Sequence, residues 1–209
     1  MLLSCRIGWL RKLIAPQVAL ILALLCILPG CWVSSIHSLY EESKDQDVIT
    51  DPNLAGTWTV TDDDQCTTTL TVTMQAAVYS LHTVESGEAC SNRGEVSNYQ
   101  ARLVKLDAHR FLDVSPLDKD VCDMCIAKHD ILLIKIDADS LAFTPIDSDW
   151  LKDALAAKTV TLSTLPDDSD TLTASSGDLK EFCRKFAEDK AVFKPDSTVG
   201  FRRAPGGTS

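Results

Sequence analysis

The chain has 209 residues, of which 45% are hydrophobic and 24% charged, as is ordinary for one globular domain plus a targeting segment. Its first thirty residues carry only three charges, all basic, on Arg6, Arg11 and Lys12. Removing these three from the 20 basic residues leaves 17 against 30 acidic ones, a formal net charge of −13. Such a surface repels phosphate backbones, so we expect no nucleic-acid partner. It also repels anionic lipid, so membrane attachment would require lipid chains.

The N-terminus has the layout of a signal peptide. After the basic start, residues 13–28 are apolar apart from Gln17. A run of about 16 residues is short for a bilayer span of roughly 20 but matches a signal-peptide core. Leu28-Pro29-Gly30-Cys31 follows directly.

These four residues resemble the bacterial lipobox, with Pro29 in place of the usual Ala or Ser. The resemblance implies diacylglycerol on the Cys31 thiol, cleavage after Gly30 and acylation of the new amine. Two or more chains anchor a protein stably, because each buried methylene contributes roughly 0.8 kcal/mol. Trp32, rather than Asp, after the cysteine resembles lipoproteins sent to the outer membrane. An uncleaved anchor and an ordinary signal peptide are the alternatives.

The sequence thus predicts four regions. Residues 1–30 are a signal peptide, 31–51 a lipid anchor and polar tether, 52–203 one β-rich domain, and 204–209 a disordered tail. Within the tether, the helical spacing of Ile36, Leu39 and Tyr40 predicts one docked turn.

From Leu54 onward, short runs alternate between apolar and polar residues. Residues 56–61 place Trp58 and Val60 on one face and threonines on the other, and residues 69–74 repeat the pattern, which is typical of half-buried strands. The candidate strands are 56–61, 69–74, 78–83, 99–106, 110–115, 130–136, 141–145, 160–163, 171–174 and 199–203. So many short strands predict a mainly β fold, an antiparallel barrel or sandwich.

Two segments predict helices instead. Residues 149–157 form the first, which Asp147, Ser148 or Asp149 could cap. Residues 176–189 carry one apolar face, formed by Leu179, Phe182, Cys183 and Phe186.

Gly56-Thr57-Trp58 resembles the first strand of the lipocalin and calycin barrels. In that family the Trp closes the base of the barrel and an Arg from a late strand packs over it. The resemblance therefore implies a pair of Trp58 with Arg202, or with the adjacent Arg203. It also implies an interior cavity for one small apolar ligand, although a filled barrel is equally compatible with the sequence. The helix at 149–157, between strands, departs from an uninterrupted eight-strand meander.

Five cysteines remain in the predicted domain: Cys66, Cys90, Cys122, Cys125 and Cys183. An exported domain meets an oxidising environment, so we expect disulfides. Cys66 and Cys90 flank two candidate strands and are the favoured pair.

Cys122-Asp123-Met124-Cys125 is open to three interpretations: a structural disulfide within the motif or to Cys183, a redox-active dithiol, or a zinc site. The zinc ligands would be Cys122, Cys125, His129 and Cys183. We otherwise expect no cofactor.

No catalytic motif stands out. The sequence favours a non-enzymatic envelope lipoprotein that binds a small apolar ligand or another envelope protein. The alternatives are a structural or assembly accessory with a filled barrel, and a thiol-redox or hydrolytic enzyme.

Overall fold

The computed structural model describes residues 32–41, 45–91, 93–117, 126–166 and 168–205. The strands in this part of the chain are β1 Ser34–Ser35, β2 Val48–Ile49, β3 Gly56–Thr61, β4 Thr67–Gln75, β5 Val78–Ser86, β6 Val96–Leu106, β7 His109–Pro116, β8 His129–Ile136, β9 Ser140–Pro145, β10 Thr164–Leu165, β11 Asp168–Leu172 and β12 Val199–Arg203. The helices are α2 Ser148–Ala156 and α3 Ser176–Phe186, with short 3-10 turns η1 Pro52–Leu54 and η3 Pro195–Ser197.

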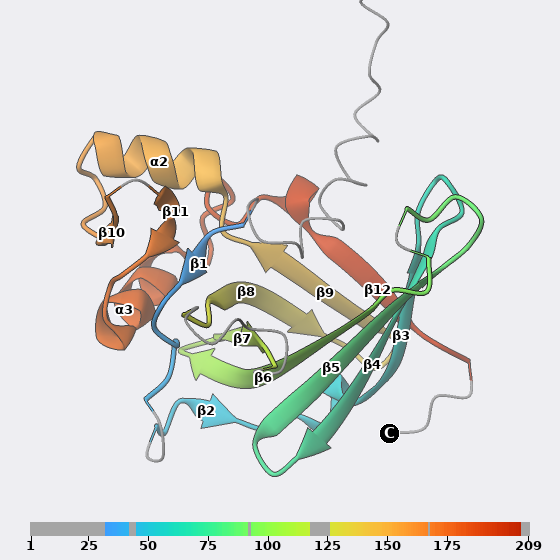
Figure 1. The fold of residues 1–209 in the computed structure, drawn as a ribbon. Coiled ribbons are helices and arrows are strands. Elements are labelled where there is room, and N and C mark those ends of the chain that lie inside the picture. The colour runs from blue at the N-terminus through green and yellow to red at the C-terminus, as the bar shows by residue number, and fades with distance from the viewer. Residues whose placement is uncertain (1–31, 42–44, 92, 118–125, 167, 206–209) are drawn as a thin grey trace, which may run out of the picture.

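Eight antiparallel strands close into a barrel (Figure 1). Strands β3 to β9 follow one another as a meander, and β12 closes the ring by pairing with both β9 and β3. The predicted mainly β fold with an antiparallel, lipocalin-like barrel is confirmed. Both helices lie in the chain between β9 and β12, so the meander is interrupted only before its last strand.

The barrel interior is the predicted apolar face of the strands. Trp58 is fully buried and lies opposite Leu70 of β4, while Thr57 and Thr59 face outward and are partly exposed. Because successive side chains of a strand point to opposite faces, this register brings every second residue of β3 and β4 into the core.

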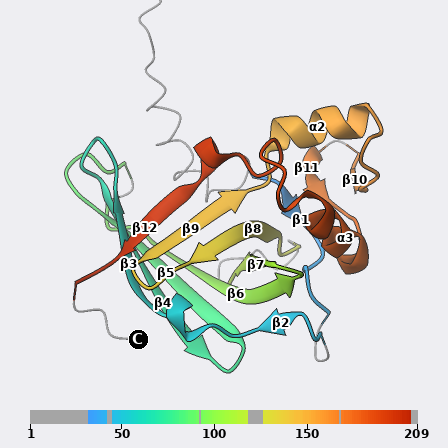
Figure 2. The ribbon, with the colours of Figure 1, turned by 180° about the vertical axis from the view of Figure 1, so that it is seen from behind.

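The two helices lie beside the barrel wall (Figure 2). A second core of buried side chains lies between them and the wall. Strand β7 separates the two cores: Leu112 and Val114 point into the barrel, whereas Phe111 packs under the helices. This explains why 111–115 is buried on both faces. On the helix side Trp150 of α2 meets Phe186 of α3 edge to face, with ring centroids 5.2 Å apart.

Both predicted helices are present with shifted ends. Asp147 caps α2 by accepting from the Trp150 amide at 2.7 Å, and Ser175 caps α3. Helix α3 ends at Phe186 rather than at 189. The prediction of a strand at 160–163 is wrong, because these residues form no ladder, although Thr164–Leu165 pairs briefly with β11. The strand predicted at 171–174 lies earlier, at Asp168–Leu172.

The prediction that 31–51 is a tether is wrong for most of its described residues. Leu39 is fully buried in the second core, and β1 and β2 pair with the barrel wall. Lys180 of α3 fixes the segment further, with its Nζ 2.6 Å from Asp45 and 2.8 Å from Asp47. A polar composition concealed these contacts, since most of the acidic groups are engaged in ion pairs and turns.

One end of the barrel is closed by Trp58 and Arg203. The Arg203 guanidinium stacks on the Trp58 ring at 4.1 Å from its centroid. It also donates to the carbonyl oxygens of Asn53, Ala55 and Ala138 at 2.7–3.1 Å. Gly56 lies beside it with a φ of +133°, which other residues rarely adopt, and a Cβ there would also lie 2.5 Å from the guanidinium.

Arg202 is therefore the wrong partner for Trp58. Phe201 of β12 points into the barrel, so the alternation along the strand turns Arg202 outward, where it is exposed, and Arg203 inward.

Arg203→Ala should lower the free energy of unfolding by about 1–3 kcal/mol, because it removes a stacked cation and three hydrogen bonds. Arg202→Ala is the matched control and should change stability by less than about 0.5 kcal/mol. Urea denaturation measures both. Equal losses in the two variants would contradict the assignment of Arg203 to the closed end.

Candidate ligand-binding site

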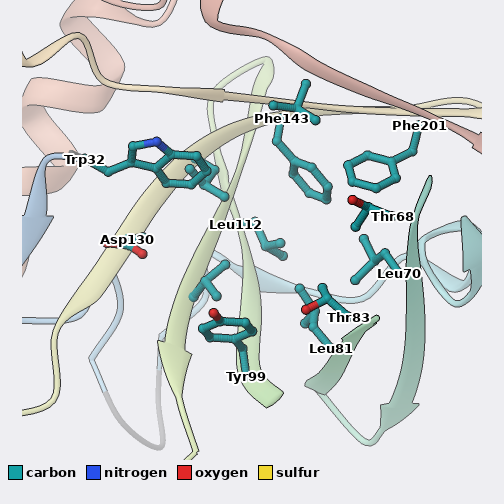
Figure 3. Close-up of a pocket in the computed structure, with 13 residues that line it drawn as sticks. Trp32, Thr68, Leu70, Leu81, Thr83, Tyr99, Leu112, Asp130, Phe143 and Phe201 are labelled. Atoms are coloured by element: carbon teal, nitrogen blue, oxygen red, sulfur yellow. The ribbon is translucent and has the colours of Figure 1, made fainter. Parts of the chain in front are cut away.

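The end of the barrel opposite Trp58 holds a pocket, which we call the mouth pocket (Figure 3). It lies where β4, β8 and β12 begin and β5, β7 and β9 end. Its walls are mostly aliphatic and aromatic: Trp32, Thr68, Leu70, Leu81, Thr83, Tyr99, Leu112, Val114, Asp130, Leu132, Phe143, Val199 and Phe201. Below it, the rest of the interior is filled by buried side chains around Trp58.

The free space in the mouth pocket is about 60 Å³. A water molecule needs roughly 10–15 Å³ of such space, so about four to six would fit, or a short apolar chain. Fused ring systems would require side chains to move. The pocket is also open on one side, so a longer ligand could project out of the barrel.

Thr68 places an unpartnered hydroxyl in this wall. Its residue is 3% exposed, and Oγ1 has no hydrogen-bond partner among the described residues. Buried polar atoms are rarely left unpaired, and such an atom in a pocket wall is a position for a water or ligand polar group.

Asp130 is the acidic group of the mouth pocket. It is the second residue of β8, and its side chain shares the inward face with Leu132 and Ile134. Strands β4 and β8 stand four apart in the ring of eight, so Thr68 and Asp130 lie on opposite walls, as Figure 3 shows.

Burial raises the pKa of the Asp130 carboxyl above its ordinary value, and the nearby charge of Asp113 acts in the same direction. A hydrogen bond with Ser34 and the charges of His129 and Lys128 oppose this rise. A carboxyl whose pKa is raised by folding contributes stability below its unfolded pKa and loses that contribution as the pH rises through the folded value. Ionised Asp130 therefore costs folding free energy.

The residues from 32 to 41 bring Trp32 to this end of the barrel. Ser34 pairs with Asp130 in the β1–β8 ladder, so the indole two residues earlier reaches across the mouth pocket (Figure 3). Below the ladder, the buried Asp113 carboxylate accepts from the Leu39 amide and from His129 Nδ1, both at 2.6 Å. These two bonds hold the segment against the barrel wall.

His129 is thereby engaged on the outer side of the barrel, not in the pocket. Burial lowers its pKa, but the hydrogen bond and charge of Asp113 outweigh this and raise the pKa above the ordinary value. The protonated form is therefore stabilised in the fold.

The predicted Cys66–Cys90 disulfide is present, with Cα atoms 5.0 Å apart. It joins the β3–β4 loop to the β5–β6 loop, at the same end of the barrel as the mouth pocket. The two sulfurs also lie near the Glu85 carboxylate, but a disulfide does not offer thiolate ligands to a metal.

Cys183 is fully buried among the side chains of the second core as a free thiol, and burial raises its pKa far above the ordinary value, so it is a poor nucleophile. Cys122 and Cys125 lie outside the described residues, as does Cys31. The zinc site of Cys122, Cys125, His129 and Cys183 thus stays a prediction.

No family model, no curated protein and no solved structure matches this chain. Among the described residues, no helix combines the length and apolar character needed to cross a bilayer. Function must therefore be inferred from the geometry of the mouth pocket itself.

The sequence contained a signal for Asp130 and Thr68 that its interpretation missed. Asp130 continues the alternation of Leu132, Ile134 and Ile136 by one step, and Thr68 continues that of Leu70 and Val72. A polar residue in the inward register at a strand end marks the rim of a barrel interior.

Proposed function

We propose that this chain is a lipid-anchored protein of the cell envelope whose barrel binds a small apolar ligand through its open end. The observation that carries the proposal is the mouth pocket: a largely apolar hollow with a few polar groups, at the unfilled end of an otherwise packed barrel.

The anchor is inferred from the lipobox resemblance at Leu28–Cys31 and from the export signal that precedes it. Trp32, the residue after the proposed lipidated cysteine, lines the mouth pocket. Acyl chains on Cys31 would therefore hold the barrel with its open end near the bilayer. Trp32 in place of Asp supports the outer membrane as the destination in a cell with two membranes.

A structural or assembly accessory is the second candidate. The filled interior around Trp58 and the small volume of the pocket support it, since a barrel that only presents a surface needs no cavity. The two candidates differ in whether the mouth pocket takes up a ligand saturably.

Binding can be measured with 1-hexanol on protein isolated from cell membranes and reconstituted in phosphatidylcholine vesicles. Six buried carbons at about 0.8 kcal/mol each contribute about 5 kcal/mol before the cost of association is subtracted, so we expect weak binding, with a Kd of about 1 mM or higher. We expect a saturable change in tryptophan fluorescence, because Trp32 lies at the site; vesicles without protein correct for partitioning.

Leu81→Phe places a larger side chain in the mouth pocket and should weaken 1-hexanol binding at least about fivefold. His82→Phe is the matched control, because His82 is next to Leu81 in β5 but its side chain points out of the barrel and is exposed. Absence of saturable binding, or equal binding by the two variants, would favour the accessory role.

The anchor has its own test. Mass spectrometry of the protein from expressing cells should find residue 31 at the N-terminus with diacylglycerol and an acyl chain attached, and Cys31→Ala should abolish both. An unmodified thiol at position 31 would remove the anchor from the proposal without affecting the pocket.

A further inference from the structure

Asp130 is a carboxylate without a counter-ion in an apolar pocket. None of the ion pairs among the described residues includes it, and its side chain is hydrogen-bonded with Ser34. Both neighbouring cationic side chains are committed elsewhere: Lys128 Nζ lies 2.7 Å from Thr171 Oγ1, and His129 is bonded to Asp113.

A second polar group faces the same space and has no hydrogen-bond partner among the described residues. The Thr68 hydroxyl is buried and unpartnered on the opposite wall. The polar side chains of the wall also include Thr83 and Tyr99. One polar group without a hydrogen bond and another without a counter-ion, in one small and mostly apolar hollow, indicate that the hollow is shaped for a ligand that carries polar groups.

We propose that the ligand of the mouth pocket is a cationic amphiphile, an aliphatic amine whose ammonium group pairs with Asp130 while its chain lies against Leu112, Leu132 and Phe143. This inference rests on the proposed ligand-binding function and names the chemical class of the ligand. No covalent step is involved.

The chemistry of the wall selects an amine over an alcohol or an acid. An ammonium ion donates charge-assisted hydrogen bonds to the carboxylate and also neutralises its charge, whereas an alcohol donates one hydrogen bond and leaves the buried charge without a counter-ion. A fatty acid would place two negative charges in one poorly solvated site. Burial also raises the pKa of Asp130, so the ionised carboxylate is costly in the free protein and gains most from a cation.

The test compares hexylamine, 1-hexanol and hexanoate at pH 7.5 on the reconstituted protein, by titration of tryptophan fluorescence. We expect hexylamine to bind at least about tenfold more tightly than 1-hexanol, and hexanoate to bind most weakly. In Asp130→Asn the preference for the amine should fall to within about twofold while 1-hexanol still binds.

The net negative charge of the protein attracts amines everywhere, so a charge-matched control is needed. Asp64→Asn removes one exposed carboxylate from the β3–β4 loop at the same end of the barrel and should leave the preference for the amine unchanged.

The outcomes separate the two proposals. Saturable binding of all three compounds with no preference for the amine, or a preference that survives Asp130→Asn, overturns this inference alone. Saturable binding by none of them overturns the proposed function and this inference together.

Discussion

The stacking of the Arg203 guanidinium on Trp58 joins the last strand of the barrel to the first. It fixes which end of the barrel is solid. The same guanidinium donates to the carbonyl oxygen of Asn53, just before β3, and to that of Ala138, in the β8–β9 turn. The backbone carbonyl dipoles thereby offset the cost of removing the Arg203 charge from water at the closed end of the barrel. Above it, large side chains fill the interior as far as the middle of the strands.

The open end follows from this division. Beyond Leu112 the interior is lined but not filled, and the wall there contains Thr68 and Asp130. Both break the rule that inward positions are apolar. Asp130 in addition costs folding free energy when ionised, because its pKa is raised by burial. Residues that break local rules at a cost in stability are commonly retained for function. The chemistry proposed for the pocket assigns that role to the carboxylate.

Sequence periodicity predicted the barrel well because its signal is local. The alternation in 56–61 and 69–74 identified the inner face correctly, and the capped helices were found within a few residues of their ends. The errors arose where the direction or burial of a side chain depends on a shift of one residue in register or on a contact distant in the chain. Arg202 and Arg203 differ only in parity along β12, which Phe201 settles. The burial of Leu39 depends on Asp113, 74 residues away in the chain, so the sequence predicted that Leu39 docks but not what it docks against.

The sequence predicted that the barrel holds a cavity but not which residues line it. The resemblance at Gly56–Trp58 implied a hollow interior but did not identify the residues around it. Which inward residues face free space depends on where the packed core ends, and that depends on the sizes of side chains from all eight strands together.

A crystal structure under xenon pressure tests the central claim that the barrel is solid at one end and hollow at the other. Xenon enters apolar space without needing hydrogen bonds. We predict a xenon peak between Leu112, Phe143 and Phe201 and none around Trp58. A mouth pocket without xenon, filled by its own side chains, would contradict the account.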